Sequence, residues 1–164
     1  MLRIASKQPT SGRSAPRASF SYRDDPAVPE FPDDKPIIVF DGYCALCTGW
    51  AAFVLRHDKQ GHYRLLTAQS ELGRALYVHY GLDPDDYETN ILIDDGVAWF
   101  KAEGSIRMAV GLGWPWRAAL LLRVLPSGFS NWLYDRVARN RLRWFGKREA
   151  CYVPAPSDAD RFLS

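Results

Sequence analysis

The chain has 164 residues, of which 47% are apolar and 24% are charged, as in an ordinary globular domain. This length is sufficient for one domain with a hydrophobic core of its own. The net charge of +2 is too small to indicate, by itself, binding to nucleic acid or to an anionic membrane.

The first 34 residues are predicted to form a disordered tail. They are rich in Ser, Pro and Arg, and no acidic residue precedes Asp24. A basic, acid-free start is also typical of an organellar transit peptide, but a convincing amphipathic helix is missing. A disordered tail, an extended start site and a targeting segment therefore remain alternatives.

No stretch of the sequence predicts a secretory signal or a membrane span. The longest apolar run, residues 118–122, is far shorter than the roughly 20 residues that cross a bilayer. Three cysteines, two of them only three positions apart, do not form the disulfide framework of a small secreted protein. We expect a soluble protein in the cytoplasm, or in an organelle if residues 1–34 are a transit peptide.

The first ordered element is expected at residues 37–40, Ile-Ile-Val-Phe, a run typical of a strand buried on both faces. Asp41-Gly42 ends this strand. From Leu46 to His57 the apolar residues follow helical spacing. Cys44 and Cys47 therefore lie where a central strand meets a helix.

The next elements alternate in the same way. Residues 63–67 predict a second strand, and Ser70 is a plausible N-cap for a helix that ends at Gly81. Two further strands flank Asp94-Asp95-Gly96, which is a strong hairpin signal. Ser105 is expected to cap a short helix that follows the hairpin.

The resulting order, β-α-β-α-β-β-α, is that of an α/β protein with the thioredoxin fold. We assign this core to residues 35–112. Two further helices, near 116–125 and 130–143, predict a helical extension over residues 113–154 that packs on the core. Residues 155–164 form a C-terminal tail.

Three motifs resemble those of the DCC family, bacterial and plastid proteins classed as predicted thiol–disulfide oxidoreductases. They are Asp41-Gly42-Tyr43-Cys44-Ala45-Leu46-Cys47 after the apolar strand, the segment 69–73 (Gln-Ser-Glu-Leu-Gly), and the segment 134–141 followed by Phe145-Gly146. Cys151 also falls where the family tends to carry a late cysteine. The resemblance covers about residues 36–154 and implies thiol–disulfide exchange without a further cofactor, with a protein or a low-molecular-weight thiol or disulfide as substrate.

The position of the two cysteines suggests how they divide the chemistry. Cys44 at the helix N-terminus is expected to attack as a thiolate, because the unpaired backbone N–H groups there favour negative charge. Cys47, one turn further on, is expected to be more buried and to resolve the mixed disulfide. The apolar pair between them offers no cation, so we predict only a modest lowering of the Cys44 pKa.

Neighbouring residues are assigned supporting roles. Asp41 either relays protons to Cys47 or fixes the turn by accepting backbone N–H groups, and the structural role is favoured. Gly42 gives the backbone freedom, and Gly42 and Tyr43 are expected to belong to a substrate-docking surface beside the exposed sulfur. Thioredoxins place a cis-proline opposite the disulfide, but this chain has none near Glu88-Thr89-Asn90. Thr89 and Asn90 are therefore predicted to dock substrate in a different way.

Other functions are weighed against this hypothesis. The pair could merely pack in the core, or bind structural zinc with His57 and His62, although the spacing is short for such a site. The basic C-terminal helix could bind an anionic partner or nucleic acid, a binding module rather than an enzyme, but solvated arginines are the simpler interpretation. Cys151 and the cluster Trp114-Pro115-Trp116 are expected mainly to fill the interior. We expect no metal and no nucleic acid.

Overall fold

The computed structural model describes residues 21–87 and 89–163. The first 20 residues of the predicted tail, and Glu88, lie outside the described residues. Residues 21–34 correct the predicted tail, because they are packed rather than disordered. Tyr22 and Val28 are buried in the core, and Arg23 binds both Asp33 and Asp95.

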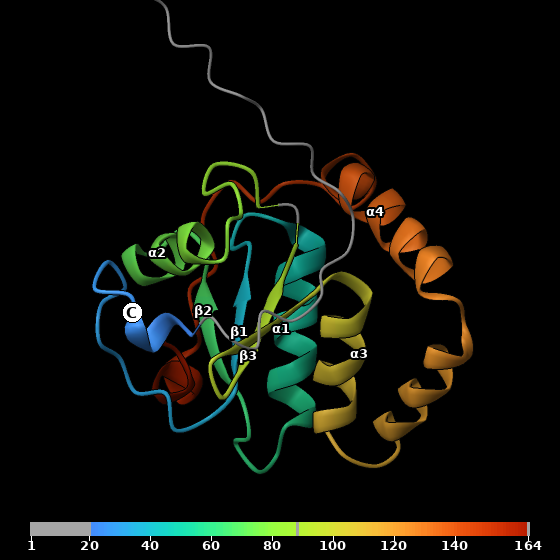
Figure 1. Ribbon diagram of the computed structural model, residues 1–164, viewed down its shortest axis with the longest axis horizontal. Coiled ribbons are helices and arrows are strands. Elements are labelled where there is room, and N and C mark those ends of the chain that lie inside the picture. The colour runs from blue at the N-terminus through green and yellow to red at the C-terminus, as the bar shows by residue number, and fades with distance from the viewer. Residues whose placement is uncertain (1–20, 88, 164) are drawn as a thin grey trace, which may run out of the picture.

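Four strands form one mixed sheet (Figure 1). They are β1 (Ile37–Phe40), β2 (Arg64–Thr67), β3 (Ile91–Asp94) and β4 (Val97–Phe100), in the spatial order β2-β1-β3-β4. Strand β1 pairs in parallel with β2 and antiparallel with β3, and β3 pairs antiparallel with β4. Every residue of β1 is at most 1% exposed, as its unbroken apolar sequence predicts.

Helices cover both faces of the sheet. Helix α1 (Ala45–His57) and helix α3 (Lys101–Gly111) lie on one face, and α2 (Glu71–His79) lies on the other (Figure 1). The alternation of side chains along β1 explains this, since Ile38 packs with α1 and α3 whereas Val39 packs with α2. The element order confirms the predicted thioredoxin-like fold.

The hairpin and the α2 cap are formed as predicted. Asp95 and Gly96 both have positive φ angles, 47° and 77°, the combination that a tight two-residue hairpin requires. The Ser70 side chain accepts a hydrogen bond from the Gly73 N–H at the start of α2. Helix α3, however, begins at Lys101 and not at Ser105, because the Thr89 hydroxyl accepts the Lys101 N–H from across the fold.

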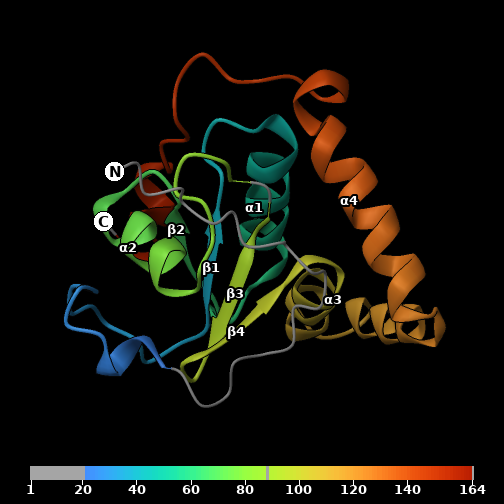
Figure 2. The same cartoon turned by 45° about the horizontal axis from the view of Figure 1, so that its top comes forward.

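The helical extension consists of a 3-10 helix, η2 (Trp116–Val124), and the long helix α4 (Ser127–Trp144). Helix η2 packs on α3, while α4 contacts both α3 and α1. The chain then returns across the domain to the β2 edge of the sheet, as the red trace in Figure 2 shows. There the predicted tail forms the short helix η3 (Pro156–Arg161), and Arg161 pairs with the buried Asp58. No helix among the described residues is long and apolar enough to cross a membrane.

Gly73 is predicted to be essential to the fold. A Cβ atom there would lie 2.3 Å from the Thr67 carbonyl oxygen, so Gly73→Ala must push α2 away from the sheet. We expect a loss of about 1–3 kcal/mol in the free energy of unfolding. The matched control is Gly49→Ala in α1, where an added Cβ meets nothing within 4 Å. This control should be neutral or slightly stabilising in chemical denaturation, and equal effects of the two substitutions would contradict the packing argument.

Candidate active site

The two cysteines lie where β1 leads into α1, in residues 41–47, which we call the CxxC loop although Cys47 already belongs to the first turn of α1. Cys44 is the N-cap of α1, and its sulfur accepts a hydrogen bond from the Cys47 N–H over 3.3 Å. A sulfur thus takes the place of the oxygen that usually caps a helix. Sequence spacing predicted this position at the junction of strand and helix.

The pKa values of the two thiols are shifted in opposite directions. The pKa of the Cys44 thiol is lowered to about 6, mainly because the Cys47 side chain donates a hydrogen bond to it. The Cys47 N–H and the positive charge of Arg141 lower this pKa further, whereas burial and Asp41 oppose the shift. The pKa of Cys47 is raised by its hydrogen bond with Cys44 and by burial. At neutral pH the pair therefore holds a Cys44 thiolate beside a Cys47 thiol.

The burial of the two sulfurs differs from the prediction. Cys44 was expected to be exposed, but it is 0% exposed; Cys47 is buried as predicted, with 7% of its surface exposed. Residues 146–152, which we call the strap, lie against the CxxC loop, and Lys147 forms a β-bridge with Cys44 itself. Its backbone bonds to the CxxC loop at three points. The Gly146 carbonyl accepts the Ala45 N–H, and the N–H groups of Arg148 and Tyr152 donate to the carbonyl oxygens of Tyr43 and Gly42.

Asp41 has the geometry of the structural role. One carboxylate oxygen accepts the Tyr43 N–H over 2.9 Å and the Gln69 side-chain amide over 2.7 Å. Gln69 in turn accepts the Gly42 N–H through its side-chain oxygen. The CxxC loop is therefore held to the β2–α2 connection, which gives Gln69 a physical purpose that the sequence motif did not reveal.

Gly42 is required for close packing more than for backbone freedom. A Cβ atom at Gly42 would lie 2.5 Å from the Cys151 sulfur. Cys151 belongs to the strap, and burial raises the pKa of its thiol. Its contact with Gly42 brings the strap against the CxxC loop.

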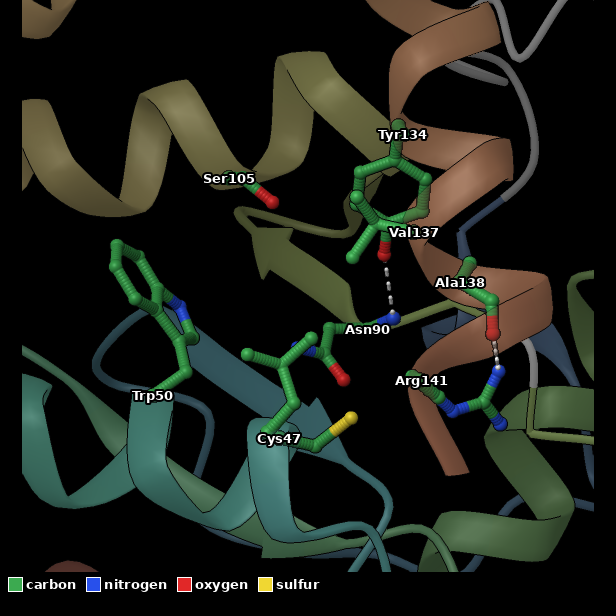
Figure 3. A pocket seen from close by; sticks show the side chains of 9 residues that line it. Cys47, Trp50, Asn90, Ser105, Tyr134, Val137, Ala138 and Arg141 are labelled. Atoms are coloured by element: carbon green, nitrogen blue, oxygen red, sulfur yellow. Dashed lines mark hydrogen bonds between the residues drawn. The ribbon is translucent and has the colours of Figure 1, made fainter. Parts of the chain in front are cut away.

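A cavity of about 180 Å³ opens beside Cys47 (Figure 3). Its wall is largely apolar and combines α1, α3 and α4 with the start of β3. The lining residues are Leu46, Cys47, Trp50, Asn90, Ser105, Tyr134, Val137, Ala138 and Arg141. Cys47 contributes to this wall and Cys44 does not, so the second sulfur faces the cavity.

Thr89 and Asn90, two of the four residues predicted to dock substrate, have different positions. Asn90 lines the cavity, and its side-chain oxygen is buried without a hydrogen-bond partner among the described residues. Thr89 is buried, and its hydroxyl lies 3.2 Å from the Tyr134 hydroxyl. Thr89 therefore supports the wall and does not face the cavity.

Arg141 is the residue that sequence reasoning missed. It was counted among solvated arginines, yet it is only 7% exposed. Its guanidinium donates to the carbonyl oxygens of Ala138 and Tyr87 and lies 3.7 Å from Asp41. The signal was present in α4, where Tyr134, Ala138 and Arg141 follow helical spacing and so share the face turned toward the cavity.

The zinc hypothesis is not supported by the positions of the histidines. Cys44 and His57 lie at opposite ends of α1, whose 13 residues span about 20 Å. The His57 ring packs against Phe53 and Trp116. Among residues 21–87 and 89–163, no three His, Cys, Asp or Glu side chains converge as a metal site would require.

A scan of family models matches residues 38–147 to the DCC1-like thiol-disulfide oxidoreductase model. The match spans the CxxC loop, the cavity and helix α4. The chain belongs to the DCC1-like family. The uncharacterized protein YuxK of Bacillus subtilis is 35% identical over 127 residues, which are 77% of this chain and 93% of that protein. The chloroplastic DCC family protein At1g52590 of Arabidopsis thaliana is 33% identical over 120 residues, or 73% and 70% of the two chains. No solved structure matches.

Arg141 is predicted to hold the Cys44 pKa down. Arg141→Met removes the nearby positive charge, so the Cys44 midpoint should rise above about 6. Asp41→Asn removes a negative charge and should move the midpoint in the opposite direction. The midpoints are measured by ultraviolet thiolate absorbance against pH in a Cys151→Ser background. Arg143→Met, on the exposed side of α4, is the control and should leave the midpoint unchanged; an unchanged midpoint in Arg141→Met would contradict the assignment.

Proposed function

We propose that the protein exchanges disulfides with a protein or low-molecular-weight substrate through Cys44 and Cys47. The observation that carries this proposal is the hydrogen bonding of Cys47, through both its N–H and its side chain, to the Cys44 sulfur. It provides a thiolate and a neighbouring thiol in one turn of helix, which is what a two-step exchange needs. Membership of an oxidoreductase family agrees with this chemistry.

The exchange is balanced without a further cofactor. The Cys44 thiolate attacks a substrate disulfide, forms a mixed disulfide and releases one substrate thiolate. Cys47 then attacks the Cys44 sulfur, its proton passes to the leaving group, and the second substrate thiol departs. The substrate gains two electrons and the Cys44–Cys47 pair becomes a disulfide; the reverse sequence oxidises a substrate dithiol.

Substrate access is proposed from two sides of the pair. The cavity beside Cys47, with Asn90 in its wall, would receive the substrate group next to the reacting disulfide. Cys44 is covered by the strap, so its attack requires the strap to move away from Tyr43 and Gly42. Such docking differs from that of thioredoxin, as the missing cis-proline at this position implies.

A reducing compartment suits this proposal. The closely spaced pair and the single further cysteine do not form a disulfide framework, so the protein does not depend on an oxidising environment for its fold. We propose a cytoplasmic location on this ground. The name of the Arabidopsis relative places that protein in the chloroplast.

The order of attack is predicted to be Cys44 first and Cys47 second. In a Cys151→Ser background, Cys47→Ser should accumulate mixed disulfides through Cys44, because the resolving thiol is absent. Cys44→Ser should accumulate far less, since Cys47 remains buried and burial still raises the pKa of its thiol. Non-reducing electrophoresis and mass spectrometry with a disulfide reagent distinguish the two.

Two outcomes would contradict the proposal. If Cys44→Ser accumulates mixed disulfides through Cys47, then Cys47 is the attacking cysteine and Cys44 the resolving one. The absence of a reversible two-electron disulfide between Cys44 and Cys47, in titration against a dithiothreitol couple, would end the redox function. The Cys151→Ser variant alone is the control and should retain the reversible couple.

A further inference from the structure

The junction of η2 and α4 exposes an unusual number of large apolar side chains. Residues 121–129 are exposed without interruption, and Val124 reaches 83% exposure. We call the exposed apolar side chains of this junction the apolar ridge. It comprises Leu121, Leu122, Val124, Leu125, Phe129, Trp132 and Leu133.

The apolar ridge is not matched elsewhere on the described surface. Of the 14 exposed large hydrophobic residues among those described, only Val78 and Val153 lie outside residues 114–145. Helix α4 already uses its other face, with Tyr134 and Val137, to line the cavity. The ridge therefore has no partner within the described part of the fold, and such patches mark interaction surfaces.

The extension that carries the ridge is strongly basic, even though Arg123 pairs with Glu103 of α3 and Arg141 is buried. Between residues 114 and 148 the sequence holds eight Lys or Arg residues and a single acidic residue, Asp135, which pairs with Lys101. No carboxylate among the described residues lies within ion-pair distance of Arg136, Arg139 or Arg143. These three arginines follow the ridge along α4, three or four residues apart.

From this arrangement we propose that the extension binds peripherally to an anionic lipid surface. Trp, Phe and Leu beside a row of arginines are the composition of elements that lie in the membrane interface, with apolar side chains in the acyl boundary and cations at the headgroups. Phe129 and Trp132 stack with ring centroids 5.9 Å apart, so they present one continuous aromatic surface. The charge complementarity favours anionic lipid over a second copy of this chain, whose own extension would bring the same positive charge.

The proposal is tested by co-sedimentation with vesicles. The full-length protein should bind vesicles of phosphatidylcholine and phosphatidylglycerol in equal parts, and bind pure phosphatidylcholine vesicles far less. The triple variant Leu121→Ser, Val124→Ser, Trp132→Ser should lower the affinity for anionic vesicles by about tenfold or more. Arg136→Ser with Arg139→Ser should lower it by a similar factor and weaken its dependence on salt.

Matched controls separate the ridge from general surface effects. Val78→Ser with Val153→Ser removes exposed apolar side chains elsewhere, and Arg56→Ser with Lys59→Ser removes two exposed cations near the far end of α1. Neither control should change vesicle binding. Cys44→Ser with Cys47→Ser should also bind normally, so the test is independent of the proposed redox function. Thermal unfolding confirms that each variant is folded.

Several results would overturn the proposal. No binding to anionic vesicles, equal binding to neutral vesicles, or full binding by the triple variant would each do so. A dimer in light scattering that the triple variant abolishes, without vesicle binding, would assign the ridge to self-association. Oligonucleotide binding that requires the arginines and not the ridge, again without vesicle binding, would assign the surface to nucleic acid.

Discussion

The hydrogen bond from the Cys47 N–H to the Cys44 sulfur is the interaction on which the site depends. It caps helix α1, holds the two cysteines one helical turn apart and adds to the lowering of the Cys44 pKa, of which the Cys47 side chain is the main cause. It can form only because β1 is buried on both faces and delivers the chain to the helix start at a fixed point in the sheet. The hydrogen bond that caps α1 thus also helps to lower the Cys44 pKa. A substitution that frays the first turn of α1 should therefore raise this pKa.

The charges around the pair connect the core to the extension. Arg141 comes from α4 and Asp41 from the CxxC loop, and they act on the Cys44 pKa with opposite signs. Neither residue is exposed, so solvent screens them little. The extension is therefore part of the site, which agrees with a family model that continues through α4 to residue 147. Without α4 the cavity would lack one wall and the thiolate its cation.

Local patterns predicted the elements that depend on local physics. The apolar run of β1, the Ser70 cap and the Asp95-Gly96 turn all formed where the sequence placed them. Features that depend on distant contacts were not predictable in this way. Helix α3 starts four residues before the predicted Ser105 because the Thr89 hydroxyl accepts a hydrogen bond from the Lys101 N–H. Arg141 is buried because its guanidinium donates hydrogen bonds to the carbonyl oxygens of Tyr87 and Ala138. The strap has no periodic pattern, and it covers Cys44 through backbone hydrogen bonds that any sequence could make.

The strap has a further consequence for the lifetime of the site. A thiolate with a lowered pKa is the form of cysteine that peroxides convert to sulfenic and then irreversibly to sulfinic acid. Cys44 has no accessible surface in this structure, so a small oxidant reaches its sulfur only if the strap moves. A low thiol pKa usually makes a cysteine both a good nucleophile and easy to oxidise. Here the strap limits oxidation of Cys44 although the pKa of its thiol is lowered. Under the proposed redox function, such a cover would protect the thiolate between reactions with substrate.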